Sequence, residues 1–153
     1  TRDEFRAEVW LAIIHGARGI FYFAHSDCVA GPCTTPDGMT ADLVDEMTIQ
    51  NARISGIASV LQSPINPSTI GFAPGKSAVN LPLEATWRQS GGKSYLIVAN
   101  ASPNPLTAAP MVVSGLPAGT SALTVHGENR SVSLASGQFS DSFQPYAVHI
   151  YRN

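Results

Sequence analysis

The chain has 153 residues, of which 44% are apolar and only 13% carry a charge, and its formal net charge at pH 7 is −2. Soluble domains average about 25% charged residues, so this sequence is poor in charge. It has no basic excess to neutralise phosphates, which excludes an electrostatic nucleic-acid binder. No apolar run of the sequence reaches the roughly 18 residues that a membrane span needs. We therefore expect a globular protein with neither a nucleic-acid nor a membrane partner.

The first residues predict an amphipathic helix with recognisable ends. Thr1 and Glu4 fit a capping box, with Thr1 as the N-cap and Glu4 three positions later. Apolar residues then recur at helical spacing through Phe5, Val9 and Ile13. Gly16 is typical of the glycine that follows a helix end.

Residues 19–24 form a run that is apolar on both faces, the pattern of a parallel strand covered on both sides. Residues 41–62 predict a second amphipathic helix. A parallel strand needs parallel neighbours and crossover connections, and residues 1–63 contain no second strand of this type. The pattern predicts the end of a larger α/β domain whose earlier strands lie outside this chain. The alternative is that this strand joins the sheet of the domain that follows.

Composition changes near residue 64. Residues 1–63 carry four basic and eight acidic side chains, whereas residues 64–153 carry five basic and three acidic ones. After this boundary short runs with strand character alternate with turn signals, and Gly91-Gly92 marks a two-residue hairpin. The predicted strands are residues 69–73, 84–90, 93–100, 111–114, 121–126, 130–135, 138–143 and 146–151. So many short strands favour an antiparallel β-sandwich over residues 64–153.

Cysteine usage and sequons bear on the compartment. Cys28 and Cys33 enclose a Gly-Pro pair, whose turn would bring the two sulfurs together, so a local disulfide is expected, with two free thiols as the alternative. Two thiols are too few for a structural zinc site, and no metal or other cofactor is expected. Asn100 and Asn129 begin possible glycosylation sequons. Together these features favour a secreted or extracellular protein.

Residues 6–23, with the sequence RAEVWLAIIHGARGIFYF, resemble the last helix–strand step of TIM-barrel glycoside hydrolases. In these enzymes a W-x-A-x-x-x-G-A-x-G-I-x-Y-F segment leads into the eighth barrel strand, and the last helix and a C-terminal β-sandwich follow. The resemblance implies an α+β chain. Residues 1–63 would be the terminal helix–strand–helix piece of a (β/α)8 barrel, and residues 64–153 the sandwich. The family's catalytic carboxylates lie on earlier strands that nothing in this chain matches, so no catalytic residue is assigned here.

Barrel active sites lie at the C-terminal ends of the strands. At that end we expect Tyr22 and His25 to bind sugar hydroxyls, with Asp27 orienting His25, and the loop from Cys28 to Cys33 to rim the cleft. The alternative for Tyr22 is a packing role only.

These observations favour the C-terminal region of a secreted glycoside hydrolase that supports the barrel and rims its sugar cleft. Its partners would be an oligo- or polysaccharide and the remainder of the barrel, or another chain that supplies parallel strands. Glycosidases need two carboxylates about 5–10 Å apart, so we expect the chain alone to be inactive. The alternative is a non-catalytic β-sandwich module, polysaccharide-binding or structural, of an extracellular assembly.

Overall fold

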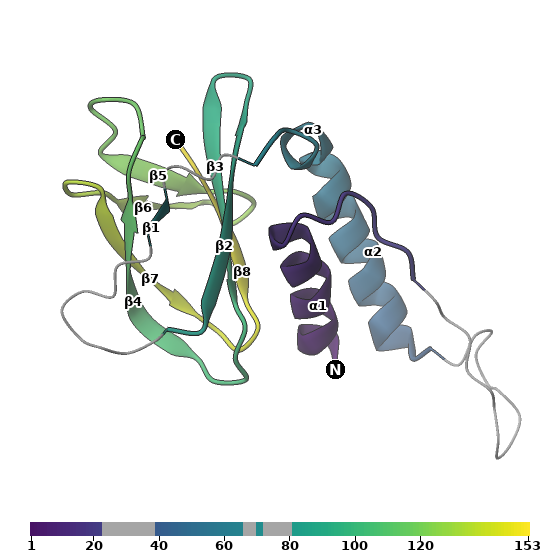
Figure 1. Cartoon of the computed structure of the whole chain (residues 1–153). Helices are drawn as coiled ribbons and strands as arrows, with labels where there is room; N and C mark the ends of the chain where they lie inside the picture. Colours follow the sequence, from purple (N-terminus) through teal and green to yellow (C-terminus); the bar gives the residue numbers. More distant parts are fainter. Residues whose placement is uncertain (23–38, 66–69, 72–80) are drawn as a thin grey trace, which may run out of the picture.

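The structure, a computed structural model, describes residues 1–22, 39–65, 70–71 and 81–153. In these ranges three helices come first: α1 (Arg2–Ile14), α2 (Ala41–Gly56) and α3 (Ala58–Leu61). Eight strands follow in the same ranges: β1 (Ile70–Gly71), β2 (Leu83–Ser90), β3 (Lys93–Asn100), β4 (Leu106–Val113), β5 (Ala122–Val125), β6 (Arg130–Ser133), β7 (Gln138–Phe143) and β8 (Val148–Arg152). The predicted α+β class is confirmed (Figure 1).

Two antiparallel sheets pack face to face as the predicted β-sandwich. The smaller sheet has the strand order β1-β4-β7 and the larger sheet the order β2-β3-β8-β5-β6. Each strand predicted after residue 64 has a counterpart in the structure. The largest difference is in β4, which begins at Leu106 rather than at residue 111. Ala108 has a φ of 48° and the register shifts beside it, so this bulge interrupts the alternation by which a strand is recognised.

The hairpin between β2 and β3 is confirmed. Gly91 and Gly92 have φ angles of 58° and 72°, the left-handed conformation that both central residues of a type I′ turn require. Ser90 pairs with Lys93 directly beside the turn, so the register is set there and runs the whole length of both strands.

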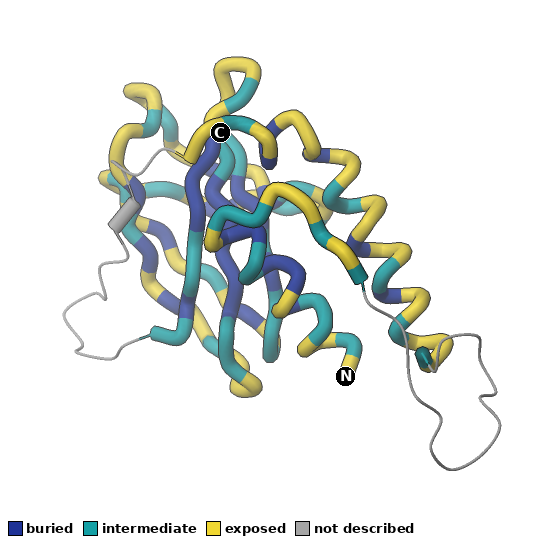
Figure 2. Tube along the Cα trace, turned by 45° about the vertical axis from the view of Figure 1, so that its right-hand side comes forward, coloured by how far each residue is buried: buried dark blue, intermediate teal, exposed yellow. Residues whose placement is uncertain are grey.

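The larger sheet is covered on both faces, which the sequence analysis did not predict. In β3, Leu96 and Val98 face the interior of the sandwich, whereas Ile97 and Ala99 pack under the helices. Figure 2 shows the buried positions gathered on these central strands and on the helix beside them. The molecule therefore has three layers: the helices, the five-stranded sheet and the three-stranded sheet.

Both predicted ends of α1 are confirmed. The Thr1 hydroxyl accepts a hydrogen bond from the Glu4 amide, and the Glu4 side chain reaches back to the N-cap backbone. At the other end Gly16 has a φ of 103°, and its N–H bonds the Ile13 carbonyl at 3.0 Å. The next amide, of Ala17, bonds the Ala12 carbonyl at 2.9 Å, which completes a Schellman motif.

The helix expected over residues 41–62 is present but interrupted. Ile57, with a φ of −123°, separates α2 from the single turn of α3. Gly56 precedes the break, and glycine costs about 1 kcal/mol relative to alanine in a helix interior. The change of direction places Ile57, Val60 and Leu61 in the core beneath the helix layer.

The strand expected over residues 19–24 is not present in the described residues 19–22, and residues 23–24 lie outside the described part. A buried parallel strand requires hydrogen-bonding neighbours, and no parallel strand occurs in the described ranges. The alternative that this segment joins the sheet of the sandwich does not hold for residues 19–22 either.

Candidate functional site

The predicted sugar-binding edge is described only at its beginning. Tyr22 lies within the described part of the chain, whereas His25, Asp27, Cys28 and Cys33 lie outside the described residues. The roles of His25 and Asp27 and the disulfide between the two cysteines therefore stay predictions.

Tyr22 packs against the two long helices. Its phenol donates a hydrogen bond to Oδ1 of Asn51 in α2, with 3.0 Å between the oxygens. Its ring lies against that of Phe5 in α1, with the centroids 5.4 Å apart. Burial raises the pKa of the Tyr22 phenol, which keeps it a neutral donor. The hydroxyl that was predicted to meet a sugar is thus occupied by Asn51 in this chain.

Side chains of residues 19–22 alternate between the helices and solvent. Ile20 and Tyr22 are half-buried against the helix layer, while Phe21 between them is 89% exposed. Such alternation is typical of a strand with one covered face. The segment crosses α2 and leads away from the two sheets (Figure 1). The helix layer therefore carries a sheet on one side and an uncovered, strand-like segment on the other.

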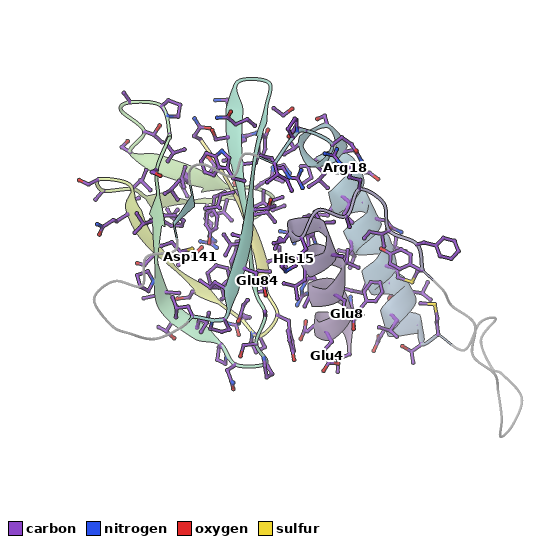
Figure 3. All side chains as sticks on the ribbon, in the orientation of Figure 1. Glu4, Glu8, His15, Arg18, Glu84 and Asp141 are labelled. Carbon is purple, nitrogen blue, oxygen red and sulfur yellow. The ribbon has the colours of Figure 1, made fainter. Side chains whose placement is uncertain are left out.

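Exposed polar contacts set the path of the chain between α1 and this segment. Arg18 Nη1 donates to the Gln62 carbonyl at 2.9 Å, and Gln62 Nε2 donates to the Arg18 carbonyl at 3.1 Å. At the end of α1, His15 Nε2 lies 2.5 Å from a carboxylate oxygen of Glu84 in β2 (Figure 3). Because the pair of His15 and Glu84 is exposed, it contributes little to stability.

A cleft of about 710 Å³ lies between α2 and the sandwich. We name it the α2–sandwich cleft. Side chains of α2, of the turn between β5 and β6 and of the segment that enters β8 form its walls, among them Ile49, Arg53, His126, Glu128, Gln144 and Ala147.

A buried polar network forms part of the α2 wall of this cleft. The Glu46 side chain is 4% exposed, and its carboxylate pairs with Arg2 at 3.2 Å and Arg6 at 3.6 Å. Gln50 donates to the same carboxylate at 2.7 Å and accepts from the indole N–H of Trp10, also at 2.7 Å. The network joins α1 to α2 and leaves neither oxygen of Glu46 free.

A second polar cluster joins the two sheets. Arg130 holds Asp141 through two bonds, Nη1–Oδ1 at 3.0 Å and Nη2–Oδ2 at 2.8 Å. The Tyr151 hydroxyl donates to the same carboxylate at 2.8 Å. Glu128 accepts from Arg130 Nε at 2.8 Å and pairs with His149. Because β7 carries Asp141 (labelled in Figure 3) while β6 and β8 carry its partners, the cluster ties the two sheets together.

The two carboxylates that line the cleft, Glu46 and Glu128, are both engaged by arginines. This is not the arrangement of a glycosidase pair, in which one carboxyl group must release a proton and the other must meet substrate or water. Among the described residues no group of His, Cys, Asp and Glu side chains is placed to hold a metal ion. No helix in the described ranges is long and apolar enough to cross a membrane.

The two sequons differ in accessibility. Asn100 is fully buried, and its amide nitrogen donates to the carbonyls of Asn104 and Gln144 at 2.8 and 3.1 Å. The Asn100 amide is thus engaged within the folded chain, and its sequon stays a prediction. Asn129 is exposed in the turn between β5 and β6, where its φ is 51°, and its sequon stays a prediction.

Comparison with known proteins finds similarity at the level of structure. No protein-family profile matches the chain, and no curated protein matches it in sequence. A variant of AmyP in complex with maltotriose is similar in structure, with a TM-score of 0.55 and 10% identity over 74% of this chain. Gan42B, a GH42 beta-galactosidase, aligns over 72% of this chain at 8% identity, with a TM-score of 0.36. The chain spans 21% of the length of AmyP and 12% of that of Gan42B.

Asp141 should make the stability of the chain depend on acid pH. Burial alone would raise the pKa of Asp141, but hydrogen bonds from Arg130 and Tyr151 hold it below its ordinary value of 3.8. A depressed folded pKa stabilises the fold above that ordinary value, and the contribution is lost as pH falls toward the folded pKa. Asp141→Asn should lower the free energy of unfolding at pH 7 by about 1–3 kcal/mol and weaken this acid dependence.

Urea unfolding at pH 7 and pH 3 measures both effects. Glu84→Gln is the matched control, because its carboxylate pairs with His15 at an exposed position, and its effect should stay below about 1 kcal/mol. The stabilising role of the cluster would be contradicted if both variants lost the same free energy of unfolding at pH 7. It would also be contradicted if Asp141→Asn kept the pH dependence of the unaltered chain.

Proposed function

We propose that this chain is the C-terminal region of a longer, secreted, carbohydrate-active glycoside hydrolase. In this proposal α1, residues 19–24 and α2 are the last helix–strand–helix units of a (β/α)8 barrel. The sandwich supports the barrel from outside, and the segment after Tyr22 rims a cleft for an oligo- or polysaccharide. The catalytic carboxylates lie outside the chain, so the isolated chain is expected to be inactive.

The observation that carries the proposal is the position of Phe21. Its side chain is 89% exposed, whereas its neighbours Ile20 and Tyr22 pack against the helices. An isolated exposed aromatic is unremarkable, but here it belongs to an apolar, alternating run on the face of the helices that the sandwich leaves open. A barrel strand has this arrangement, with one face on the helix layer and the other in the barrel interior.

Structural similarity supports the same class of protein. AmyP was solved with bound maltotriose and shares the fold of this chain over 74% of its length. The chain corresponds to only 21% of AmyP. If this chain is a piece of a larger carbohydrate-active protein, both the shared fold and the small share of AmyP that is covered are explained.

The aromatic side chains of the sandwich bear on the alternative, a polysaccharide-binding module. Sugar-binding modules present aromatic rings to the ligand. In the described part of the sandwich Trp87, Phe139, Phe143 and Tyr151 are between 1% and 5% exposed, and Tyr95 and Tyr146 are partly buried. The four buried rings fill the core between the sheets, so they favour a supporting role for the sandwich over direct binding.

Secretion is proposed from the sequence alone and is tested through the cysteines. An unreduced proteolytic digest of the freshly isolated protein should contain the Cys28 and Cys33 peptides joined by a disulfide, as detected by mass spectrometry. Recovery of both residues as free thiols would contradict the bridge and weaken the secreted assignment.

The barrel assignment predicts that Phe21→Asp is nearly neutral in the isolated chain and destabilising in the longer protein. In the isolated chain the side chain is exposed, so the free energy of unfolding should change by less than about 0.5 kcal/mol. In the longer protein the same carboxylate would be buried among strands, and the loss should be about 3 kcal/mol or more. Hydrolysis of a polysaccharide panel should be seen only with the longer protein and should fall in its variant.

Ser133→Asp, at an exposed position of β6, is the control and should be nearly neutral in both contexts. A Phe21→Asp variant that is neutral in the longer protein as well would remove the evidence for the barrel. Hydrolysis by the isolated chain would show that the active site lies within it.

A further inference from the structure

The α2–sandwich cleft has the dimensions of a small-molecule site. Its volume of about 710 Å³ lies within the range of roughly 300–1,000 Å³ that is usual for ligand pockets. It opens on the opposite side of α2 from Asn51, the residue that holds Tyr22. The cleft is therefore distinct from the predicted sugar-binding edge.

Arg53 is the cation in this cleft that has no carboxylate partner among the described residues. Its Nη2 donates to the Val148 carbonyl at 2.9 Å, and its guanidinium carbon lies 5.0 Å from the centre of the Trp10 ring. Burial lowers the pKa of Arg53, but arginine remains charged at any physiological pH. The bond to Val148 uses one of five N–H donors, and these are arranged in the plane that matches a carboxylate.

The other charges of the cleft are already neutralised. Glu46 is held by Arg2 and Arg6, and Glu128 is held by Arg130. Arg53 forms no direct ion pair among the described residues, although Glu128 and Glu46 attract its guanidinium at longer range. A ligand with a negative group can meet it without displacing an existing pair.

The cleft that Arg53 lines also has polar and apolar groups that suit a hydroxylated ring. The His126 ring and the Gln144 amide line the cleft, and neither side chain has a hydrogen-bond partner in the described ranges. Ile49, which is 50% exposed, and Ala147 contribute apolar surface. The cleft thus offers one cation, two hydrogen-bonding side chains and an apolar patch.

We propose that the α2–sandwich cleft binds a uronic acid residue of a saccharide. Its carboxylate pairs with Arg53, its hydroxyls bond His126 and Gln144, and the apolar face of its ring lies on Ile49. That the ligand is a sugar rests on the proposed function, whereas the requirement for a carboxylate rests on Arg53 alone. A carboxylate of a peptide would satisfy Arg53 too, but would leave the hydroxyl-binding groups unused.

Titration of the full isotope-labelled chain with D-glucuronate, D-glucose and acetate, followed by amide NMR, tests the proposal. Glucuronate should shift the amides of α2 and of the turn between β5 and β6. Its dissociation constant should be at least about tenfold lower than those of glucose and acetate, because each lacks one half of the contacts. Equal binding of acetate would identify a carboxylate site without sugar selectivity, and equal binding of glucose would exclude the role of Arg53. No binding of glucuronate would overturn the proposal.

Variants locate the binding. Arg53→Gln should raise the glucuronate dissociation constant at least about tenfold. Because this change also removes the bond to Val148, His126→Ala is the second variant. Its ring makes no hydrogen bond within the described ranges, so the fold should persist while binding weakens about threefold or more. Arg18→Gln, on the far side of the helix layer, is the control and should bind as the unaltered chain does.

The outcome is separable from that of the proposed function. If the longer protein hydrolyses a polysaccharide but glucuronate shifts no amide around the cleft, the uronate site alone is overturned. Unaltered glucuronate affinity in both Arg53→Gln and His126→Ala would place any binding elsewhere and overturn the site as described.

Discussion

The packing of the helices on the outer face of the five-stranded sheet depends on a buried guanidinium. Arg88 of β2 is 1% exposed and donates to the Ser63 carbonyl at 2.8 Å and the Ile13 carbonyl at 3.5 Å. The Ile13 carbonyl lies in the last turn of α1, where the helix dipole favours a positive charge, and Ser63 follows the single turn of α3. Burial lowers the pKa of Arg88. In the described ranges no carboxylate pairs with it, so these two carbonyls are its compensation.

Because the helices dock on the sheet in this way, the other faces of the helix layer are available for further contacts. Trp10, Ile97 and Ile150 fill the interface with the sheet. One flank of α2 is left to form the cleft around Arg53, and the side that carries Asn51 receives Tyr22. On α2 the buried residues are the polar Glu46 and Gln50, whereas Val44 and Ile49 are about half exposed, at 47% and 50%. A helix with this distribution is suited to contacts on more than one side.

Local signals in the sequence predicted the elements well. The capping box of Thr1 and Glu4, the glycine at position 16 and the Gly91-Gly92 turn each act through neighbouring backbone atoms, so the sequence alone identifies them. The same holds for the strands of the sandwich, apart from the bulge at Ala108. Local patterns are informative wherever the partner lies a few residues away.

Features that depend on contacts between residues far apart in the sequence were not predicted. Residues 95–99 of β3 are apolar on both faces, the same pattern as residues 19–24, and this was the available sign that a layer covers the sheet. The cluster of Arg130, Asp141 and Tyr151 was missed because its members are far apart in the sequence. Asp141 does alternate with Phe139 and Phe143, which places it on the inward face of β7. The unpaired position of Arg53 was not predicted, because nothing in the sequence indicates which arginine lacks a carboxylate partner in the fold.

The proposed function requires a further, parallel sheet on the face of the helix layer opposite the sandwich, supplied by the rest of the longer protein. Hydrogen–deuterium exchange at the amides of residues 20–22, in the isolated chain and in the longer protein, tests it most directly. The amide of Leu96, in the centre of the five-stranded sheet, serves as a reference that should be protected in both. We predict fast exchange of residues 20–22 in the isolated chain and strong protection in the longer protein, where parallel neighbours would bond them. Equally fast exchange in both would contradict the account.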